Sequence, residues 1–447
     1  TLRWNHLFSD KLFMKLSLIY NDYNFALEAT QNTWVFALFS GIKDINEKLD
    51  FDYYLNTDHH LKFGLEHTYH TFIPNTASAR SEVDSIFIEP EESSKRFAHE
   101  WAAFITDDYK INEVLKLNYG LRFSGFHQIG PYDYFQKDDN GNVIDTITYG
   151  KGVNVANYTG LEPRLSLRYL INEKSSLKAS VTYNNQYIHL VSNSTSTLPT
   201  DLWMPSTKLV KPQKGVQYSA GYFRNFKKDK IETSVEVYYK DMKNQIEYTD
   251  GYTPSIGQNI ESYFTFGDGQ SYGAEFFINK KMGKLTGWIG YTWSKTFRLF
   301  EEINNAEIFP TKFDRRHDLS VVVGYDLGRR IRFGGCFVYG SGNALTLPSS
   351  RYFIEQSVVN EYGPRNGFRL SDYHRLDISM TLFGNPDKVR KIESNWVFAV
   401  YNVYNRKNPY FIYFSNEGNI FEGTLDIKAK QVSLFPIIPS ITWNFKF

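Results

Sequence analysis

Four histidines near the start of the chain are the first candidates for chemistry. His59 and His60 are adjacent, and His67 and His70 follow within eleven residues. Neutral imidazole is a common ligand of zinc and copper, so such a group could bind a transition metal. The stretch has the pattern of an extended strand, on which positions 67 and 70 differ by an odd number and face opposite sides. The spacing therefore argues against a metal site, and we expect none.

A second candidate is KDDNGN, residues 137–142, whose oxygen ligands alternate as in a calcium loop. Asp138, Asn140 and Asn142 supply those oxygens, but the glutamate that an EF-hand loop carries at its twelfth position is missing. A hairpin turn on Asn140-Gly141 is the simpler interpretation.

Glycine-rich stretches could also belong to an enzyme, but their spacing is wrong. YGSGN at 339–343 is not a G-x-S-x-G nucleophile elbow, and GDGQSYG at 267–273 does not fit a nucleotide-binding loop. A hydrolase embedded in a membrane would need a Ser/His pair on its lipid face. We expect no catalytic residues and no cofactor; esterase or protease turnover by the purified protein would overturn this.

The run FDRRHD at 313–318 concentrates charge just before an apolar strand. If the strand's alternation extends back through it, Asp314, Arg316 and Asp318 share the water-facing row. Arg315 and His317 then lie on the other row. The run is either an anchor of charge pairs that positions a loop over a pore or a solvated strand end. We favour a structural role, because exposed ion pairs contribute only about 0 to 1 kcal/mol each.

The elements that carry these residues are strands, because apolar and polar residues alternate along almost the whole chain. In GLEPRLSLRYL, Leu165, Leu167 and Tyr169 alternate with Ser166 and Arg168. After INEKSS the pattern resumes in LKASVTYNN, so the two stretches read as a hairpin, and no segment has a convincing helical period. The same alternation occurs in VLKLNYGLRF, VQYSAGY, ETSVEVYYK, LTGWIGYTW, DLSVVVGYDL and RLDISMTL.

Short and long connections take turns between these strands. Short turns on one rim and long loops on the other are the layout of a bacterial outer-membrane β-barrel. The short turns lie at 9–11, 171–176, 226–230, 280–284 and 326–330, and the long stretches at 127–160, 191–214, 249–269, 300–315 and 348–371.

A soluble β-sandwich also alternates and is the alternative fold. Its apolar face would carry mainly Leu, Ile and Val, and it would have short loops at both ends. Here the apolar row is rich in aromatic residues near the strand ends, which is typical of side chains at the two bilayer interfaces. We therefore predict an all-β transmembrane antiparallel β-barrel as one domain over residues 1–447.

Composition agrees with this class and excludes others. The 447 residues carry a net charge of +1, which predicts no attraction to nucleic acid, and 17% are aromatic. No run of about 18 apolar residues is present, so helical membrane spans are excluded. Cys336 is the only cysteine, which excludes an internal disulfide, and its parity places it on the inner row.

The chain ends in ITWNFKF, in which large apolar residues alternate with polar ones up to the last position. Trp443, Phe445 and Phe447 share the apolar row. The alternation gives about 17 strands, an odd number, whereas single-chain bacterial barrels have even counts. Because an open edge in lipid leaves backbone groups unpaired, we expect at least one further strand upstream of Thr1.

Several segments together resemble the barrel of TonB-dependent outer-membrane receptors. They are FDRRHDLSVVVGYDL at 313–327, YGSGNALTLP at 339–348, VYNVYNRKNPYFIYF at 400–414 and SLFPIIPSITWNFKF at 433–447. The likeness is closest to the Bacteroidota type, whose N-terminus carries a carboxypeptidase-regulatory-like domain. It implies a location in the bacterial outer membrane, a 22-stranded barrel of which about five strands are missing here, and a plug domain that this sequence lacks.

The same resemblance implies partners and a function. The partners are the lipid bilayer, the chain's own N-terminal plug, a TonB-type energy-coupling protein and the barrel-assembly machinery, which would recognise the C-terminal strand with Trp443, Phe445 and Phe447. A surface lipoprotein lid is a further partner that some relatives have. The implied function is energised uptake of a scarce solute through the outer membrane.

Two other functions stay open at this stage: a passive porin, and a structural or secretion-associated barrel that binds partner proteins at the cell surface. A globular domain upstream of Thr1 would favour the receptor, and a signal peptide directly before a strand would favour the porin. No substrate-binding residue is assigned. Aromatic residues of the long loops could stack on a ligand or simply pack: Tyr132, Tyr134, Trp203, Tyr252 and Tyr263.

Overall fold

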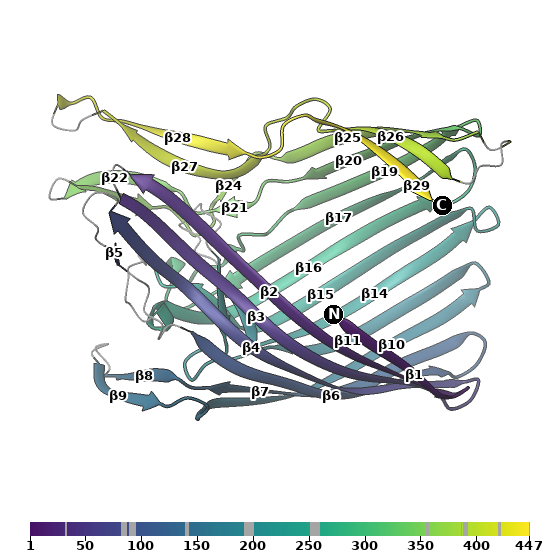
Figure 1. The fold of residues 1–447 in the computed structure, drawn as a ribbon, viewed down its shortest axis with the longest axis horizontal. Helices are drawn as coiled ribbons and strands as arrows, with labels where there is room; N and C mark the ends of the chain where they lie inside the picture. Colours follow the sequence, from purple (N-terminus) through teal and green to yellow (C-terminus); the bar gives the residue numbers. More distant parts are fainter. Residues whose placement is uncertain are drawn as a thin grey trace.

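A computed structural model gives the fold of the chain, which is dominated by one large antiparallel β-sheet (Figure 1). The structure describes residues 1–31, 34–81, 87–88, 95–138, 143–191, 201–250, 260–354, 357–385, 387, 392–418 and 422–446. Among these residues there is no α-helix, and no helix is long and apolar enough to cross a membrane.

The sheet is a meander in which each long strand pairs with the next one along the chain. Its long strands are β1 (Leu2–Ser9), β2 (Leu12–Gln31), β3 (Trp34–Tyr54), β4 (His59–Ser81), β6 (Arg96–Lys110), β7 (Leu115–Ile129), β10 (Asn154–Asn172), β11 (Ser175–Gln186), β14 (Gln213–Phe226), β15 (Ile231–Tyr248), β16 (Phe264–Lys280), β17 (Leu285–Leu299), β19 (His317–Leu327), β20 (Ile331–Gly340), β25 (Tyr373–Phe383), β26 (Glu393–Tyr401) and β29 (Ile438–Lys446).

Short elements branch from one end of this meander. Two-residue strands β5 (Phe87–Ile88) and β18 (Phe309–Pro310) pair with β4 and β17. The remaining elements are β8 (Tyr132–Lys137) with β9 (Val143–Tyr149), β12 (Ile188–Val191) with β13 (Leu202–Pro205), β21 (Ala344–Leu345) with β24 (Phe368–Arg369), β22 (Pro348–Ile354) with β23 (Ser357–Tyr362), β27 (Pro409–Glu417) with β28 (Asp426–Ser433), and the 3-10 turns η2 (Ile260–Tyr263) and η3 (Asn304–Ala306).

The two rims differ as the sequence predicts. Short turns join the long strands at one end of the sheet, on the right in Figure 1, and the paired short strands gather at the other end. The turn on Asn140-Gly141 lies outside the described residues, although the arms of its hairpin, β8 and β9, pair as expected. Several strands far exceed the 9 to 11 residues that cross a bilayer, so the sheet projects well beyond one membrane face.

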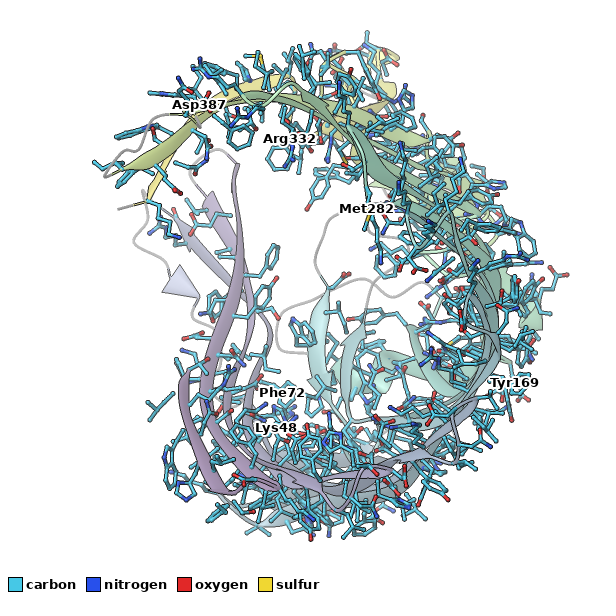
Figure 2. The ribbon with its side chains drawn as sticks, turned by 90° about the vertical axis from the view of Figure 1, so that its right-hand side faces the viewer. Lys48, Phe72, Tyr169, Met282, Arg332 and Asp387 are labelled. Atoms are coloured by element: carbon cyan, nitrogen blue, oxygen red, sulfur yellow. The ribbon has the colours of Figure 1, made fainter. Side chains whose placement is uncertain are left out.

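The sheet curves around a bore, and alternate side chains face its two sides (Figure 2). On β10, Tyr169 points outward, so Leu161, Leu165 and Leu167 share the outer face and are 39 to 55% exposed. Phe72 and Lys48 point inward. A soluble sandwich would bury its apolar row between two sheets, whereas this single sheet exposes it all along its outer face, which fits contact with lipid.

The barrel is not closed in the part of the chain that the structure describes. The sheet has nineteen strands, two more than the expected seventeen, and the two-residue strands β5 and β18 account for the excess. Strands β1 and β29 form its two edges and do not pair with each other. Because every antiparallel step reverses direction, the first and last of the seventeen long strands run parallel, so direct pairing between them would break the antiparallel pattern.

Candidate functional site: the inner face and outer mouth

Charged side chains cross-link neighbouring strands on the inner face. Arg122 on β7 donates to Glu66 on β4 over a distance of 3.0 Å, although β6 lies between these strands. The residue opposite Glu66 on β6 is Ala102, whose small side chain leaves room for the guanidinium to pass. On β10, Glu162 accepts a 2.6 Å hydrogen bond from Ser124. These contacts make the inner wall polar but leave few charges unpaired here.

The β12–β13 hairpin folds inward and covers this wall near the outer mouth. Its Ile188 and Trp203 pack on an apolar cluster that several strands contribute. The hairpin also contacts β3 and β4 directly. Short strands lie within the ring of the sheet in Figure 2, as these contacts require. The cluster consists of Ile42, Phe72, Ala98, Phe126 and Tyr187, all at most 8% exposed.

A second apolar cluster ties the same hairpin to strands farther along the wall. Leu202 and Met204 of β13 are fully buried against Ile246 and Tyr248 of β15 and Phe264 of β16. Since β3 and β4 are held on one side and β15 and β16 on the other, the hairpin bridges the bore. This hairpin, which belongs to one of the long connections at the outer rim, therefore narrows the mouth.

A buried carboxylate anchors the loops beside the hairpin. The side chain of Glu261 in η2 is fully buried and accepts hydrogen bonds from the Tyr132 hydroxyl, at 2.8 Å, and the Thr207 hydroxyl, at 2.7 Å. Arg96 Nε lies 3.5 Å from the same carboxylate. Burial, together with the negative charge of Glu261, raises the pKa of Tyr132 far above its usual value. Tyr132 therefore stays protonated and serves as a donor.

A second buried charge cluster joins distant loops at the rim. Arg365, whose side chain is 3% exposed, donates to Glu247 at 3.0 Å, to Asp250 at 3.0 Å and to the Tyr248 carbonyl at 2.9 Å. Arg298 on β17 binds the other oxygen of Glu247 at 2.6 Å. The cluster fixes the 363–367 turn onto the end of β15.

Only the last two residues of the FDRRHD run, His317 and Asp318, belong to the strand. β19 begins at His317, so Asp314 does not continue a water-facing row, and it is 2% exposed. Its carboxylate accepts from the Thr296 amide at 2.6 Å and from the Arg369 guanidinium of β24. Nearby, Arg315 Nε donates to Asn343 at 2.9 Å.

The last two residues of this motif are less enclosed. His317 Nδ1 lies 2.8 Å from the Tyr291 hydroxyl, and Asp318 lies 3.9 Å from Arg315. Arg316 approaches Asp314 at 3.7 Å. The motif thus contacts β17 and the turns beside β21 and β24. Its role as an anchor for loops over the bore stays a prediction.

The four histidines lie on two faces of the sheet. His70 is buried on the inner face, 2.7 Å from Asp44, whereas His67 lies on the outer face, with Nε2 3.0 Å from Nδ1 of His99. Within the described residues, no group of three or more His, Cys, Asp or Glu side chains has the geometry to hold a metal ion. The two faces follow from the odd spacing of positions 67 and 70.

The C-terminal aromatic residues lie on the outer face of β29. Trp443 stacks on Trp396 of β26, with ring centroids 5.9 Å apart, and its ring lies tilted against that of Phe445 at 4.8 Å. Phe447 lies outside the described residues. An assembly signal on this strand stays a prediction.

Most of the aromatic residues of the long loops pack against other residues at the outer mouth. Tyr132 is 3% exposed, Trp203 and Tyr263 pack on the apolar clusters, and the Tyr134 ring lies 4.6 Å from Lys208 Nζ. Tyr252 lies outside the described residues. The packing interpretation therefore fits Tyr132, Trp203 and Tyr263 better than an open ligand platform.

Burial of His189 predicts that docking of the β12–β13 hairpin depends on pH. His189 on β12 has no exposed surface, its Nε2 lies 2.9 Å from the Ser206 hydroxyl, and burial lowers its pKa to about 3. An exposed imidazole has a pKa of about 6.5, so between these values only the undocked hairpin binds the proton, and docking weakens as the pH falls.

We expect the docked hairpin to lose roughly 3 kcal/mol between pH 7 and pH 4.5. Hydrogen exchange of the β12 and β13 amides, corrected for intrinsic rates, measures this loss. His189→Gln should abolish the pH dependence; if the variant keeps it, another group is responsible.

Sequence reasoning missed the residues that hold the mouth together. Arg365 and Glu247 are 118 positions apart and Glu261 lies 129 positions from Tyr132, so no local spacing marks either contact. The only sequence signal was compositional: isolated charges within long, Gly- and Asn-rich loops, which are usually solvated.

Comparison with known proteins shows which family has this architecture. Residues 1–405 match the family model described as TonB dependent receptor-like, beta-barrel. No curated protein matched the chain. Many solved structures share the fold.

The ferric yersiniabactin uptake receptor FyuA from Yersinia pestis is 13% identical, with a TM-score of 0.65 over 100% of this chain and 60% of that one. The closed form of the ferric-catecholate import receptor Fiu from E. coli K12 is 14% identical, with a TM-score of 0.60 over 99% and 63%. The FrpB iron transporter from Neisseria meningitidis is 12% identical, with a TM-score of 0.54 over 97% and 63%.

At these identities the likeness concerns the fold, and the chain spans about three fifths of the length of these structures. The exposed apolar outer face, the polar inner face and the alternation of short turns with long loops are the features of an outer-membrane barrel. With the family match over residues 1–405, they show that the chain belongs to the family of TonB-dependent receptor β-barrels of the bacterial outer membrane.

Proposed function

We propose that the full-length protein takes up a scarce solute through the outer membrane with energy supplied by a TonB-type coupling protein. The observation that carries the proposal is a polar bore whose mouth is bridged by the chain's own β12–β13 hairpin. A passive porin keeps an open aqueous channel. In a protein of this family, a bridged mouth instead supports an import path that is closed at rest and opens only to deliver a solute.

The proposal includes partners that residues 1–447 do not contain. They are an N-terminal plug domain, upstream strands that complete a 22-stranded barrel, and the Bacteroidota-type domain ahead of the plug. The unpaired edges of β1 and β29 support added strands.

The barrel-assembly machinery would recognise Trp443, Phe445 and Phe447 on the last strand. Deletion of Phe447 should therefore lower the yield of assembled barrel. A surface lipoprotein lid is a further partner to seek by pull-down.

Liposome swelling distinguishes uptake by a receptor from diffusion through a porin. We expect liposomes that contain the full-length protein to swell in neutral sugars no faster than empty ones, because hairpin and plug together close the path. Removal of residues 188–205 from a protein that lacks its plug should increase swelling above that of the plugless protein alone. Porin-like swelling by the intact protein would refute the proposal.

In cells, uptake should stop when the proton gradient is dissipated. An intact barrel that recovers only protein partners in pull-downs, with no uptake defect on deletion of its gene, would favour a structural role instead.

A further inference from the structure

One register row on the inner face carries four cationic side chains on four adjacent strands. The row starts at β6 and continues without a break through β7, β10 and β11. It then passes a glycine on β14 and reaches two carboxylates on β15 and β16. In order, its members are Lys110, Lys116, Arg168, Lys178, Gly221, Glu236 and Glu275.

Like charges directly opposite each other destabilise a sheet, so this row needs compensation. Two of the cations have it: Lys110 pairs with Glu113 at 2.5 Å, and Lys116 pairs with Asp108 at 2.9 Å. Arg168 and Lys178 have no carboxylate within 4.0 Å in the described part of the chain, and Lys178 Nζ lies 3.9 Å from the centre of the Phe223 ring. The centre of the row therefore carries uncompensated positive charge.

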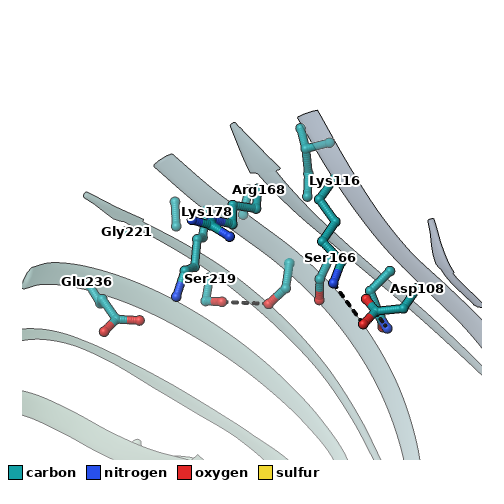
Figure 3. A pocket seen from close by; sticks show the side chains of 13 residues that line it. Asp108, Lys116, Ser166, Arg168, Lys178, Ser219, Gly221 and Glu236 are labelled. Atoms are coloured by element: carbon teal, nitrogen blue, oxygen red, sulfur yellow. Dashed lines mark hydrogen bonds and ion pairs between the residues drawn. The ribbon is translucent and has the colours of Figure 1, made fainter. Parts of the chain in front are cut away.

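These two cations are among the residues that line a hollow of about 330 Å³ (Figure 3). The next register row supplies hydroxyls from Ser166, Ser180 and Ser219, and the last two lie 2.7 Å apart. Gly221 keeps the far end open, because a Cβ there would lie 2.7 Å from Glu236 Cγ. The lining thus combines two unpaired cations, the Lys116–Asp108 ion pair, neutral donors and the Glu236 carboxylate at the opposite end.

We propose that this hollow binds a compact oxyanion, a phosphate or carboxylate group, between Arg168 and Lys178, with the serine hydroxyls as further donors. Charge-assisted hydrogen bonds of this kind are strong and favour Arg for planar or tetrahedral oxyanions. Glu236, beyond Gly221, would accept from an N–H or O–H on the same molecule. The inference deepens the proposed function, since a solute that carries such a group would meet this site inside the bore.

The oxyanion has two sources, a free solute or a carboxylate of a polypeptide segment that fills the bore, and binding of inorganic phosphate to the full-length protein in detergent distinguishes them. We expect saturable binding by calorimetry, weakened at least tenfold in Arg168→Gln and in Lys178→Gln. Lys174→Gln, in the turn that joins the same two strands, removes a positive charge away from the hollow and should bind normally.

If phosphate does not bind but the double variant exposes an upstream segment to protease, the group is a polypeptide carboxylate. If neither effect appears, the site does not exist. A protein that binds phosphate yet swells liposomes like a porin would lose the proposed uptake function and keep this site.

A second readout separates binding from a merely structural role. Where phosphate binds, so that no polypeptide carboxylate fills the hollow, Arg168→Gln measured without phosphate should unfold at the same or a higher temperature, because it removes a cation that lies between two like-charged cross-strand neighbours. Heat-modifiable gel mobility measures this temperature. A lower unfolding temperature would mean that the cations stabilise the sheet by themselves, and the proposal would fail.

Discussion

Replacing Arg365 by methionine should release the 363–367 turn from the outer rim at a cost of about 3 to 5 kcal/mol, which is typical when one partner of a buried ion pair is removed. The guanidinium holds Glu247, Asp250 and the Tyr248 carbonyl at 2.9 to 3.0 Å. Methionine fills a similar volume but leaves these acceptors without their donor. Limited proteolysis within 350–370 should become at least tenfold faster.

Two further variants test the cause. Adding Glu247→Gln to Arg365→Met should restore part of the protection, because it removes the buried charge that lost its partner. Arg351→Met is the matched control: that arginine contacts Asn360 and the Phe414 ring near the surface, and its loss should matter little. Unchanged proteolysis in Arg365→Met would show that the cluster does not hold the turn.

Phe72→Ala should undock the β12–β13 hairpin. Phe72 is fully buried on the inner face, in the cluster on which Ile188 and Trp203 rest, and truncating such a phenylalanine costs about 3 to 5 kcal/mol. The strand itself should survive, because its backbone pairs on both sides with β3 and β6. Hydrogen exchange should therefore speed up in β12 and β13 and stay slow in β4.

Phe277→Ala gives the matched control. Phe277 lies on the inner face of β16, half-buried beside Trp288, away from the hairpin. Its truncation should leave exchange in β12 and β13 unchanged. If both variants release the hairpin equally, general loosening of the sheet and not the loss of its platform is the cause.

The strands and their faces could be predicted because the information is local. In a meander each strand pairs with its sequence neighbour, so the alternation around Leu165 and Arg168 and the short turn after it are enough to place β10 against β11. The same locality explains why positions 67 and 70 were assigned to opposite faces. It fails for Asp314, where the strand starts three residues later than the alternation suggests.

The mouth could not be predicted, because its contacts join loops that are far apart in sequence. Nothing near Glu261 or Arg365 signals that their charges are buried, and nothing in residues 188–205 says whether that hairpin stands outside or folds into the bore. Likewise, only the register of three paired strands aligns Lys116, Arg168 and Lys178 in one row. Each strand by itself contributes only one cation to the row, and nothing in its own sequence shows which residues will lie beside that cation.

The sequence by itself determined the all-β class, the outward apolar row and the alternation of short and long connections, since a period of two and the turn residues act over a few positions. Tertiary structure alone decided which loop bridges the bore, which charges are buried at its rim and where unpaired cations gather on the wall. Those outcomes depend on which surfaces meet once the sheet curves, and a loop adopts the conformation that satisfies its buried polar groups there.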